Sequence, residues 1–130
     1  MKISVVIPVY NEVDSIPQLY NELMVILSNF NSYEIFFIDD GSSDGSDKEI
    51  KKIIETDSKI NLIQFYRNFG KSAALAEGFK YASGDYIITI DSDLQDDPKE
   101  IPNLINELEK GNDLVSGWKK DRKDPLSKKL

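Results

Sequence analysis

The sequence predicts an α/β domain whose mainly parallel sheet carries helices on both faces. Short apolar segments alternate along the chain with longer segments in which apolar residues recur every three or four positions, the patterns of strands and of helices. The short segments are hydrophobic at nearly every position, which is typical of parallel strands covered on both faces. The length of 130 residues, with 40% hydrophobic and 30% charged residues, fits one globular domain.

The first strand and helix are expected near the start of the chain. Residues 2–8 form a β-branched apolar run, which predicts a buried strand. Asp14 is the expected N-cap of the helix that follows, and Pro17 is tolerated in its first turn. The positions expected on the apolar face of this helix are Ile16, Leu19, Tyr20, Leu23, Ile26, Leu27 and Phe30.

A second strand and helix follow. Residues 33–38 predict the strand, and the acids and glycine of residues 39–42 end it. Ser46 and Glu49 have the spacing of a capping box, so we expect a helix from there to about Thr56.

The same alternation continues in the second half of the chain. Residues 60–66 predict a third strand, residues 67–71 a loop, and residues 72–82 a helix whose exit suits Gly84. Residues 86–90 predict the fourth strand.

The end of the sequence predicts a helix, a fifth strand and a basic tail. The helix covers about residues 101–109, and its start at Pro98 or at Pro102 stays open. Residues 114–118 predict the strand, and residues 119–130 hold six basic and two acidic side chains.

The absence of two residue types excludes whole classes of chemistry. The chain has no cysteine, which removes disulfides, zinc–thiolate sites and cysteine nucleophiles. It has no histidine either, so it contains no Ser-His-Asp triad, imidazole metal ligand or histidine base. Any reaction must use carboxylates, a metal held by oxygen ligands, lysine and arginine charges, and backbone amides.

The charge of the chain argues against general nucleic-acid binding. The net charge is −7, and residues 1–118 carry 21 acidic and ten basic side chains, whereas nucleic-acid binding needs a basic surface. No apolar run approaches the roughly 20 residues that span a bilayer, and no signal-peptide pattern opens the chain. We therefore expect a cytoplasmic location for this chain.

Polar residues follow four of the expected strands. They occupy residues 10–12, 39–40, 67–71 and 91–95. In an open parallel sheet, ligands bind beyond the carboxyl ends of the strands. The sequence therefore predicts a site at this edge of the sheet.

Asp91 and Asp93 favour a metal at that edge. Residues two apart on an extended backbone share one side, so both carboxylates can face one point. Mg²⁺ and Mn²⁺ take such hard oxygen ligands together with phosphate oxygens. The alternative is that the acids cap the helix that follows, which suits Asp97 better than the two earlier residues.

The other strand ends allow a nucleotide without requiring one. Asp39 and Asp40 could accept hydrogen bonds from a ribose hydroxyl or a base N–H, or could belong to an ordinary turn. Tyr10 could face a base or cover the sheet edge, and Lys71 could meet a phosphate at a helix N-terminus or be a surface charge. No glycine-rich dinucleotide or P-loop sequence follows the first strand, which excludes both of those classes.

Four motifs together resemble one known family. They are Val6-Ile7-Pro8-Val9-Tyr10-Asn11-Glu12, Ile38-Asp39-Asp40-Gly41-Ser42, Arg67-Asn68-Phe69-Gly70-Lys71 and Asp91-Ser92-Asp93-Leu94-Gln95-Asp96. In this order, over nearly the whole chain, they resemble the family-2 inverting glycosyltransferases. Within that family they are most similar to the dolichol-phosphate mannose synthases and the polyprenyl-phosphate (bactoprenol) glucosyltransferases. The resemblance implies the nucleotide-binding half of the GT-A fold, a Rossmann-like α/β sandwich.

The resemblance also implies roles for individual residues. Asp91 and Asp93 match the metal-diphosphate motif as catalytic residues and as ligands of Mg²⁺ or Mn²⁺, and of the two the resemblance favours Asp93 as the direct ligand. Lys119 falls where the mannose synthases often carry an arginine that meets phosphate, and lysine keeps the charge but loses the bidentate fork. The residues implied to bind substrate are Pro8, Tyr10, Glu12, Ile38, Asp40, Gln95 and Lys119.

The implied activity is metal-dependent transfer of a sugar, with inversion, from a nucleoside-diphosphate sugar of the UDP-glucose or GDP-mannose type to a polyprenyl phosphate. Such a phosphate is already largely a dianion near neutral pH, because its second pKa is about 6, so it needs no general base. A sugar hydroxyl is the alternative acceptor and requires a carboxylate base, which in such relatives lies beyond the position of Leu130.

Two further classes stay open. One is a different metal-dependent enzyme on a similar sheet, although the chain lacks the Thr/Val pattern of a haloacid-dehalogenase-type phosphatase and the glycine-rich loop of a nucleotidyltransferase. The other is a non-catalytic nucleotide-binding module.

The resemblance implies that the chain is the N-terminal part of a longer domain. Residues 1–118 are expected to bind the nucleotide sugar, and residues 119–130 to form a basic segment. The acceptor side and a membrane-associating region would follow, with the parent protein at the cytoplasmic face of the membrane and the isolated chain inactive. Apolar residues without partners near Leu114, Val115 and Trp118 would favour a homo-oligomer.

Overall fold

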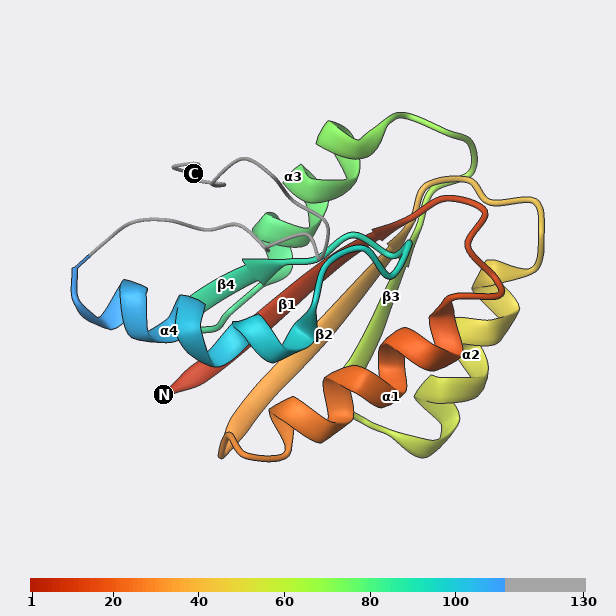
Figure 1. The fold of residues 1–130 in the computed structure, drawn as a ribbon. Coiled ribbons are helices and arrows are strands. Elements are labelled where there is room, and N and C mark those ends of the chain that lie inside the picture. Colours follow the sequence, from red (N-terminus) through yellow and green to blue (C-terminus); the bar gives the residue numbers. More distant parts are fainter. Residues whose placement is uncertain (112–130) are drawn as a thin grey trace.

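The computed structural model describes residues 1–111 as a sheet flanked by helices (Figure 1). In chain order the elements are β1 (Lys2–Val9), α1 (Ile16–Leu27), β2 (Ser32–Asp39), α2 (Ser46–Thr56), β3 (Ile60–Gln64), α3 (Lys71–Tyr81), β4 (Tyr86–Thr89), the 3-10 turn η1 (Pro98–Glu100) and α4 (Ile101–Glu109). None of the helices in this part of the chain has the length and apolar character needed to cross a bilayer. The strand expected at residues 114–118 and the basic segment at residues 119–130 lie outside the described residues.

Four parallel strands form the sheet within residues 1–111, in the order β3-β2-β1-β4. β1 is central, because its Val5 lies opposite Ile35 of β2 on one side and opposite Ile88 of β4 on the other. Since every pair is parallel, all four strands end at the same edge of the sheet. The predicted parallel α/β architecture is confirmed.

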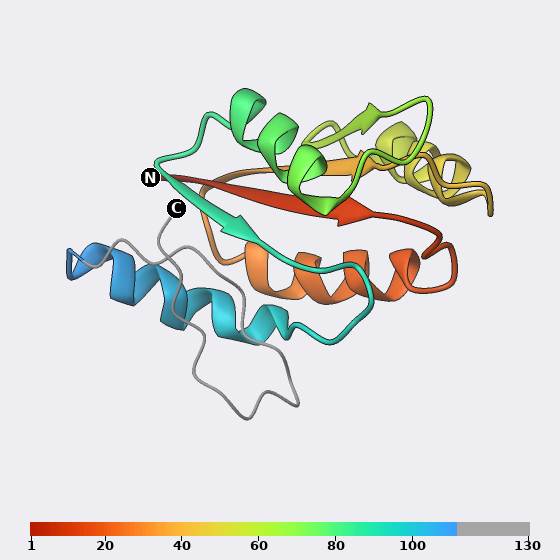
Figure 2. The ribbon, with the colours of Figure 1, turned by 90° about the horizontal axis from the view of Figure 1, so that it is seen from above.

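Helices cover both faces of the sheet, as the sequence predicts. Figure 2 shows α3 on one side of the strands and α1 and α4 on the other. Successive residues of β1 point to opposite faces. Ile7 belongs to the larger core together with Leu19 of α1 and Ile50 of α2, whereas Val6 packs with Ala74 of α3. Burial on both faces explains why the strands are hydrophobic at nearly every position.

The expected apolar face of α1 is confirmed, but its first residues differ from the prediction. Its fully buried residues are Ile16, Leu19, Leu23 and Leu27, and Tyr20, Met24 and Ile26, with Phe30 just after the helix, pack partly buried against the same core. The N-cap residue is Ser15 rather than Asp14. The Ser15 hydroxyl donates to Glu12 Oε2 at 3.0 Å and so bonds the preceding loop instead of a helical N–H.

The capping box predicted for α2 is wrong. Gly45, with a φ of +93°, takes the N-cap position, and Ser46 is the first helical residue. The Ser46 hydroxyl donates to Asp44 Oδ1 at 2.6 Å and accepts a hydrogen bond from Glu12 N–H at 3.1 Å. The hydroxyl is therefore engaged in tying the loop after β1 to the start of α2.

The last helix begins in two steps, which resolves the start that the sequence leaves open. Pro98 opens the 3-10 turn η1, and α4 begins at Ile101. Asp97 Oδ1 accepts a hydrogen bond from Lys99 N–H at 3.1 Å and caps this turn. Asp97 thus has the capping role that the sequence allows for it.

Gly84 has a packing role rather than the helix-ending role expected for it. α3 ends at Tyr81, and Gly84 lies in the segment between α3 and β4, beside Ser4 of β1. A Cβ at Gly84 would be 2.6 Å from Ser4 Oγ and 2.7 Å from Ser4 N, closer than a side chain allows. This approach lets Gly84 N–H donate to Ser4 Oγ at 2.8 Å.

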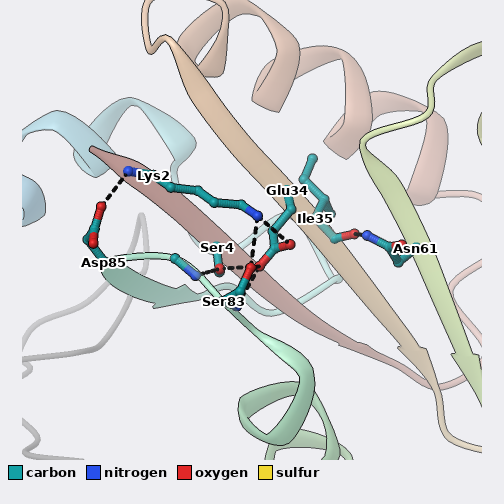
Figure 3. Close-up of polar contacts among 8 residues, drawn as sticks. Lys2, Ser4, Glu34, Ile35, Asn61, Ser83 and Asp85 are labelled. Atoms are coloured by element: carbon teal, nitrogen blue, oxygen red, sulfur yellow. Dashed lines mark hydrogen bonds and ion pairs between the residues drawn. The ribbon is translucent and has the colours of Figure 1, made fainter.

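A polar cluster around Glu34 fastens the amino-terminal edge of the sheet (Figure 3). Glu34 Oε2 accepts hydrogen bonds from Ser4 Oγ at 2.6 Å, Ser83 N–H at 2.7 Å and Ser83 Oγ at 3.1 Å. Lys2 Nζ pairs with Glu34 Oε1 at 3.1 Å. Burial alone would raise the pKa of Glu34, but the hydrogen bonds outweigh it and hold the pKa below its ordinary value of 4.5. The carboxylate joins β1, β2 and the segment before β4.

Glu34→Gln should lower the free energy of unfolding by about 1–2 kcal/mol at pH 7, because an amide loses the charge-assisted bonds of the carboxylate. A pKa that is lower in the folded state contributes stability above the unfolded-state pKa, and this contribution is lost as the pH falls through the folded-state pKa. The gap between the unchanged chain and the variant should therefore shrink below pH 4.5. Urea unfolding at pH 7 and at pH 3 measures both values.

The control is Glu109→Gln, which removes the same charge from an exposed position of α4 and should leave the free energy of unfolding nearly unchanged. If Glu34→Gln lowers the free energy of unfolding as much at pH 3 as at pH 7, the electrostatic origin of the effect is contradicted.

Candidate functional site

A cleft of about 500 Å³ opens where β1, β2 and β4 end. Its volume lies within the roughly 300–1,000 Å³ of small-molecule sites. The residues that line it are Pro8, Val9, Tyr10, Glu12, Asp40, Asn68, Gly70, Lys71, Asp91, Ser92 and Asp93. Apart from Pro8 and Val9 of β1, they come from the four polar segments that follow strands, so the structure brings these segments together as the sequence predicts.

The structure places most of the predicted site residues in this cleft. Those that line it are Pro8, Tyr10, Glu12, Asp40, Asp91 and Asp93. Ile38 does not, because its side chain is fully buried in the core beneath α3. Gln95 is exposed and outside the lining, and its N–H donates to Asp93 Oδ1 at 3.1 Å. Lys119 lies outside the described residues.

Asn68, Gly70 and Ser92 also line the cleft, although no individual role is predicted for them from the sequence. Their signal is positional, since each belongs to a polar segment that follows a strand expected from the sequence. A pattern of residue types identifies such a segment, but it does not say which of its side chains turn inward.

Asp40 holds one wall of the cleft in place. Its carboxylate is buried, and Oδ1 accepts a hydrogen bond from Phe69 N–H at 2.7 Å. Oδ2 accepts from Gly70 N–H at 3.0 Å and from Asn68 Nδ2 at 3.2 Å. Both oxygens of Asp40 are therefore engaged by the loop before α3.

Gly41 permits this contact between the loop and β2. Its φ is +76°, and a Cβ there would lie 2.3 Å from the carbonyl carbon of Arg67. Any other residue would push the loop away from the end of β2 and enlarge or deform the cleft.

Asp39, the neighbour of Asp40, is buried in a different way. It is 1% exposed, and its Oδ1 accepts a hydrogen bond from Ser42 N–H at 3.0 Å. Within the described part of the chain, its Oδ2 is buried without a hydrogen-bond partner. An unsatisfied buried acceptor costs about 1–3 kcal/mol, and Asp39 is not among the residues that line the cleft.

A tight turn after β4 presents Asp91 and Asp93 to the cleft. Asp91 N–H donates to Asp96 Oδ2 at 2.6 Å, and Leu94 takes a φ of +67°. Asp91 Oδ1 pairs with Lys71 Nζ at 2.5 Å. Because Lys71 is the first residue of α3, the N-terminus of this helix borders the cleft as well.

The oxygen donors suit a divalent metal that binds together with a phosphate ligand. Mg²⁺ is typically held by one or two carboxylates plus waters and substrate phosphates. Within residues 1–111, no group of three or more acidic side chains is placed to hold a metal by itself. The ammonium of Lys71 already lies against Asp91, so this oxygen accepts a positive charge. Asp91 and Asp93 therefore fit a metal that a diphosphate helps to hold.

The sequence is similar to known transferases over almost its whole length. The undecaprenyl-phosphate 4-deoxy-4-formamido-L-arabinose transferases of Salmonella choleraesuis and Salmonella paratyphi B are each 45% identical to it over 130 residues. The match covers 98% of this chain and 40% of each relative, so the chain spans about two-fifths of their length.

Two solved structures share the fold. The mannosyltransferase PcManGT from Pyrobaculum calidifontis, in complex with GDP-Man and Mn²⁺, is 24% identical, with a TM-score of 0.65 over 70% of this chain and 27% of its own. TarS 1–349 from S. aureus, in complex with UDP-GlcNAc, is 24% identical, with a TM-score of 0.68 over 85% of this chain and 32% of its own. The parallel sheet with its helices is thus GT-A-like, as expected.

A family profile gives the assignment. The profile described as Glycosyl transferase family 2 matches residues 4–129, which is nearly the whole chain. The chain therefore belongs to glycosyl transferase family 2.

Proposed function

We propose that this chain forms the donor-binding part of a transferase that moves a sugar from a nucleoside-diphosphate sugar to a polyprenyl phosphate. The observation that carries the proposal is the cleft in which Pro8 and Tyr10 lie together with the paired acids Asp91 and Asp93. The lipid acceptor is supported by the 45% identity to transferases named for undecaprenyl phosphate. Because the chain spans 40% of those relatives, the activity of the whole protein is part of the proposal.

The cleft suits both ends of a nucleoside diphosphate. The nucleoside would lie against Pro8, Tyr10 and Glu12, where the half-exposed ring of Tyr10 offers a stacking surface. The diphosphate would lie near the N-terminus of α3, because the first N–H groups of a helix have no partner within it and attract phosphate. Gly70 and Lys71 border that position.

The two neighbouring acids at the end of β2 would serve the donor differently. Asp40 would act indirectly, since its oxygens hold the loop that forms the cleft wall. Asp39 does not line the cleft, but its Oδ2 is buried without a partner in the described residues and would accept a hydrogen bond from a base N–H or a ribose hydroxyl.

Asp91 and Asp93 would hold Mg²⁺ or Mn²⁺, which neutralises the charge of the departing nucleoside diphosphate. The presence of Mn²⁺ with GDP-Man in PcManGT, which shares the fold, supports this cofactor. Within the chain, the turn after β4 orients the two carboxylates, and the N-terminus of α3 orients the diphosphate.

The transfer step requires no general base. An oxygen of the acceptor phosphate forms a bond to the anomeric carbon, while the bond from that carbon to the diphosphate oxygen breaks and the nucleoside diphosphate leaves with the electron pair. Attack opposite the leaving group inverts the anomeric centre. A phosphate monoester is already largely ionised near neutral pH, so it can attack without losing a proton to a base.

The remaining sequence assignments are part of this proposal. Gln95 and Lys119 would contact the substrate, residues 1–118 would form the donor-binding part, and residues 119–130 would be a basic segment. The complete protein would act at the cytoplasmic face of a membrane, where a polyprenyl phosphate is anchored, and could self-associate.

Asp93→Asn should weaken binding of UDP or GDP in the presence of Mn²⁺ by about tenfold, because the metal loses a charged ligand. Calorimetry in Mn²⁺ and in EDTA measures the effect, which should vanish in EDTA. The matched control is Asp97→Asn, in the same segment but lining a different cavity with Glu22 and Val25. Equal nucleotide affinity in Asp93→Asn and the unchanged chain would contradict the metal site.

Asp39→Asn should weaken nucleotide binding by about tenfold while leaving stability unchanged or raised. Asparagine keeps the Oδ1 acceptor for Ser42 N–H and replaces the unpartnered oxygen by an amide NH₂. Thermal unfolding and calorimetry with UDP and GDP measure the two effects. A loss of stability with unchanged nucleotide affinity would assign Asp39 a structural role instead.

The 130-residue chain should bind the donor without transferring its sugar, because it matches 40% of its relatives. We expect lipid-linked product only when the chain is fused to the remaining part of the Salmonella choleraesuis transferase. Radiolabelled UDP and GDP sugars with undecaprenyl phosphate test this, and a sugar acceptor in a parallel reaction tests the hydroxyl alternative. Equal turnover by the chain alone would show that the acceptor side lies within these residues.

A further inference from the structure

The ammonium group of Lys71 lies in the cleft, against a carboxylate proposed to hold the metal. Lys71 Nζ is 2.5 Å from Asp91 Oδ1, in an ion pair that joins the first residue of α3 to the turn after β4. Among the described residues that line the cleft, Lys71 is the one basic side chain beside the acids Glu12, Asp40, Asp91 and Asp93. Lys71 therefore supplies the positive charge of an acidic cleft.

The two partners differ in how firmly they are held. The side chain of Asp91, two residues after the end of β4, is 18% exposed, whereas the side chain of Lys71 is 58% exposed. A lysine ammonium is strongly hydrated and rides on a flexible stem, and exposed ion pairs contribute little to stability. Lys71 can therefore leave Asp91 without disturbing the fold.

A metal and Lys71 compete for the same oxygen. A magnesium ion binds a carboxylate oxygen at about 2.0–2.1 Å, so at Asp91 Oδ1 it would lie beside the ammonium of Lys71, and the repulsion between the two cations favours withdrawal of the ammonium. The withdrawn ammonium remains at the N-terminus of α3, where it meets a diphosphate together with the helical N–H groups. The diphosphate of the donor can thus become the ion-pair partner of Lys71 when the metal binds Asp91.

We propose that Lys71 is a displaceable counter-ion that makes metal binding depend on the donor. Without donor, Lys71 competes with Mg²⁺ or Mn²⁺ for Asp91. With donor, Lys71 moves to the diphosphate and leaves Asp91 Oδ1 to the metal. Linkage then requires that donor and metal strengthen each other's binding by the same factor. The inference rests on the proposed donor site and adds the residue that couples its two ligands.

Mn²⁺ binding without nucleotide tests the competition, with electron paramagnetic resonance of unbound Mn²⁺ as the measurement on the 130-residue chain. Lys71→Met should tighten Mn²⁺ binding about three- to tenfold, because it removes the competing charge and keeps the side-chain length. Lys71→Arg retains the charge and should stay within about twofold of the unchanged chain. The control is Lys80→Met, an exposed lysine in the last turn of the same helix, which should have no effect.

Nucleotide titrations test the other half of the exchange. In EDTA, Lys71→Met should bind UDP and GDP about three- to tenfold more weakly, because the cation that meets the diphosphate is gone. The factor by which Mn²⁺ strengthens nucleotide binding should also be smaller in this variant. An unchanged factor and unchanged affinity in EDTA would overturn the exchange.

Asp93→Asn in the same Mn²⁺ assay separates this inference from the proposed function. If Asp93→Asn leaves Mn²⁺ binding unchanged, the assignment of the metal site is wrong, and the inference about Lys71 is contradicted as well. If Asp93→Asn weakens Mn²⁺ binding while Lys71→Met leaves it unchanged or weakens it, the donor site stands and the competition is overturned. Tighter binding in Lys71→Met, with Lys71→Arg near the unchanged chain, supports the inference.

Discussion

The common direction of the strands decides where the polar groups of this molecule lie. Val9 at the end of β1 is level with Asp39 of β2, and Asp40 N–H donates to Val9 O at 2.8 Å. The pairing of β4 with β1 stops earlier, at Thr89 opposite Val6. The last residues of β1 therefore have a strand on one side and the turn after β4 on the other. This step in the sheet makes room for the cleft beside the end of β1.

Neighbouring carboxylates at that edge have different surroundings because strand geometry sends them in different directions. Successive residues at the end of β2 alternate between faces, so Asp40 meets the loop before α3 and Asp39 does not. Asp40 is satisfied by the protein, whereas Asp39 keeps a buried oxygen without a partner in the described residues. Asp91 has a third arrangement, in which a lysine supplies the counter-charge. The three aspartates thus differ in role: Asp40 holds the loop that forms the cleft wall, Asp39 has a buried acceptor oxygen, and Asp91 pairs with a lysine.

The fold class and the position of the cleft were predictable because each rests on local patterns. A strand buried on both faces is apolar throughout, and a polar segment after it marks the site edge, so each can be recognised one segment at a time. Contacts between segments were not predictable. The hydroxyl of Ser46 bonds Glu12 N–H instead of capping α2, which depends on where the loop after β1 passes. Whether Lys71 faces solvent or Asp91 likewise depends on the placement of α3 over the sheet.

The two edges of the sheet differ in how completely their polar groups are satisfied. At the amino-terminal edge, Glu34 has protein partners for both oxygens and needs no ligand. At the carboxyl edge, within residues 1–111, Asp39 Oδ2 is buried without a partner and Asp93 accepts a hydrogen bond from Gln95 N–H without forming an ion pair. A ligand that binds the folded chain stabilises it by an amount that grows with the logarithm of its concentration relative to its Kd. Donor and metal should therefore stabilise the edge that the protein leaves incomplete, while the opposite edge keeps the sheet folded in their absence.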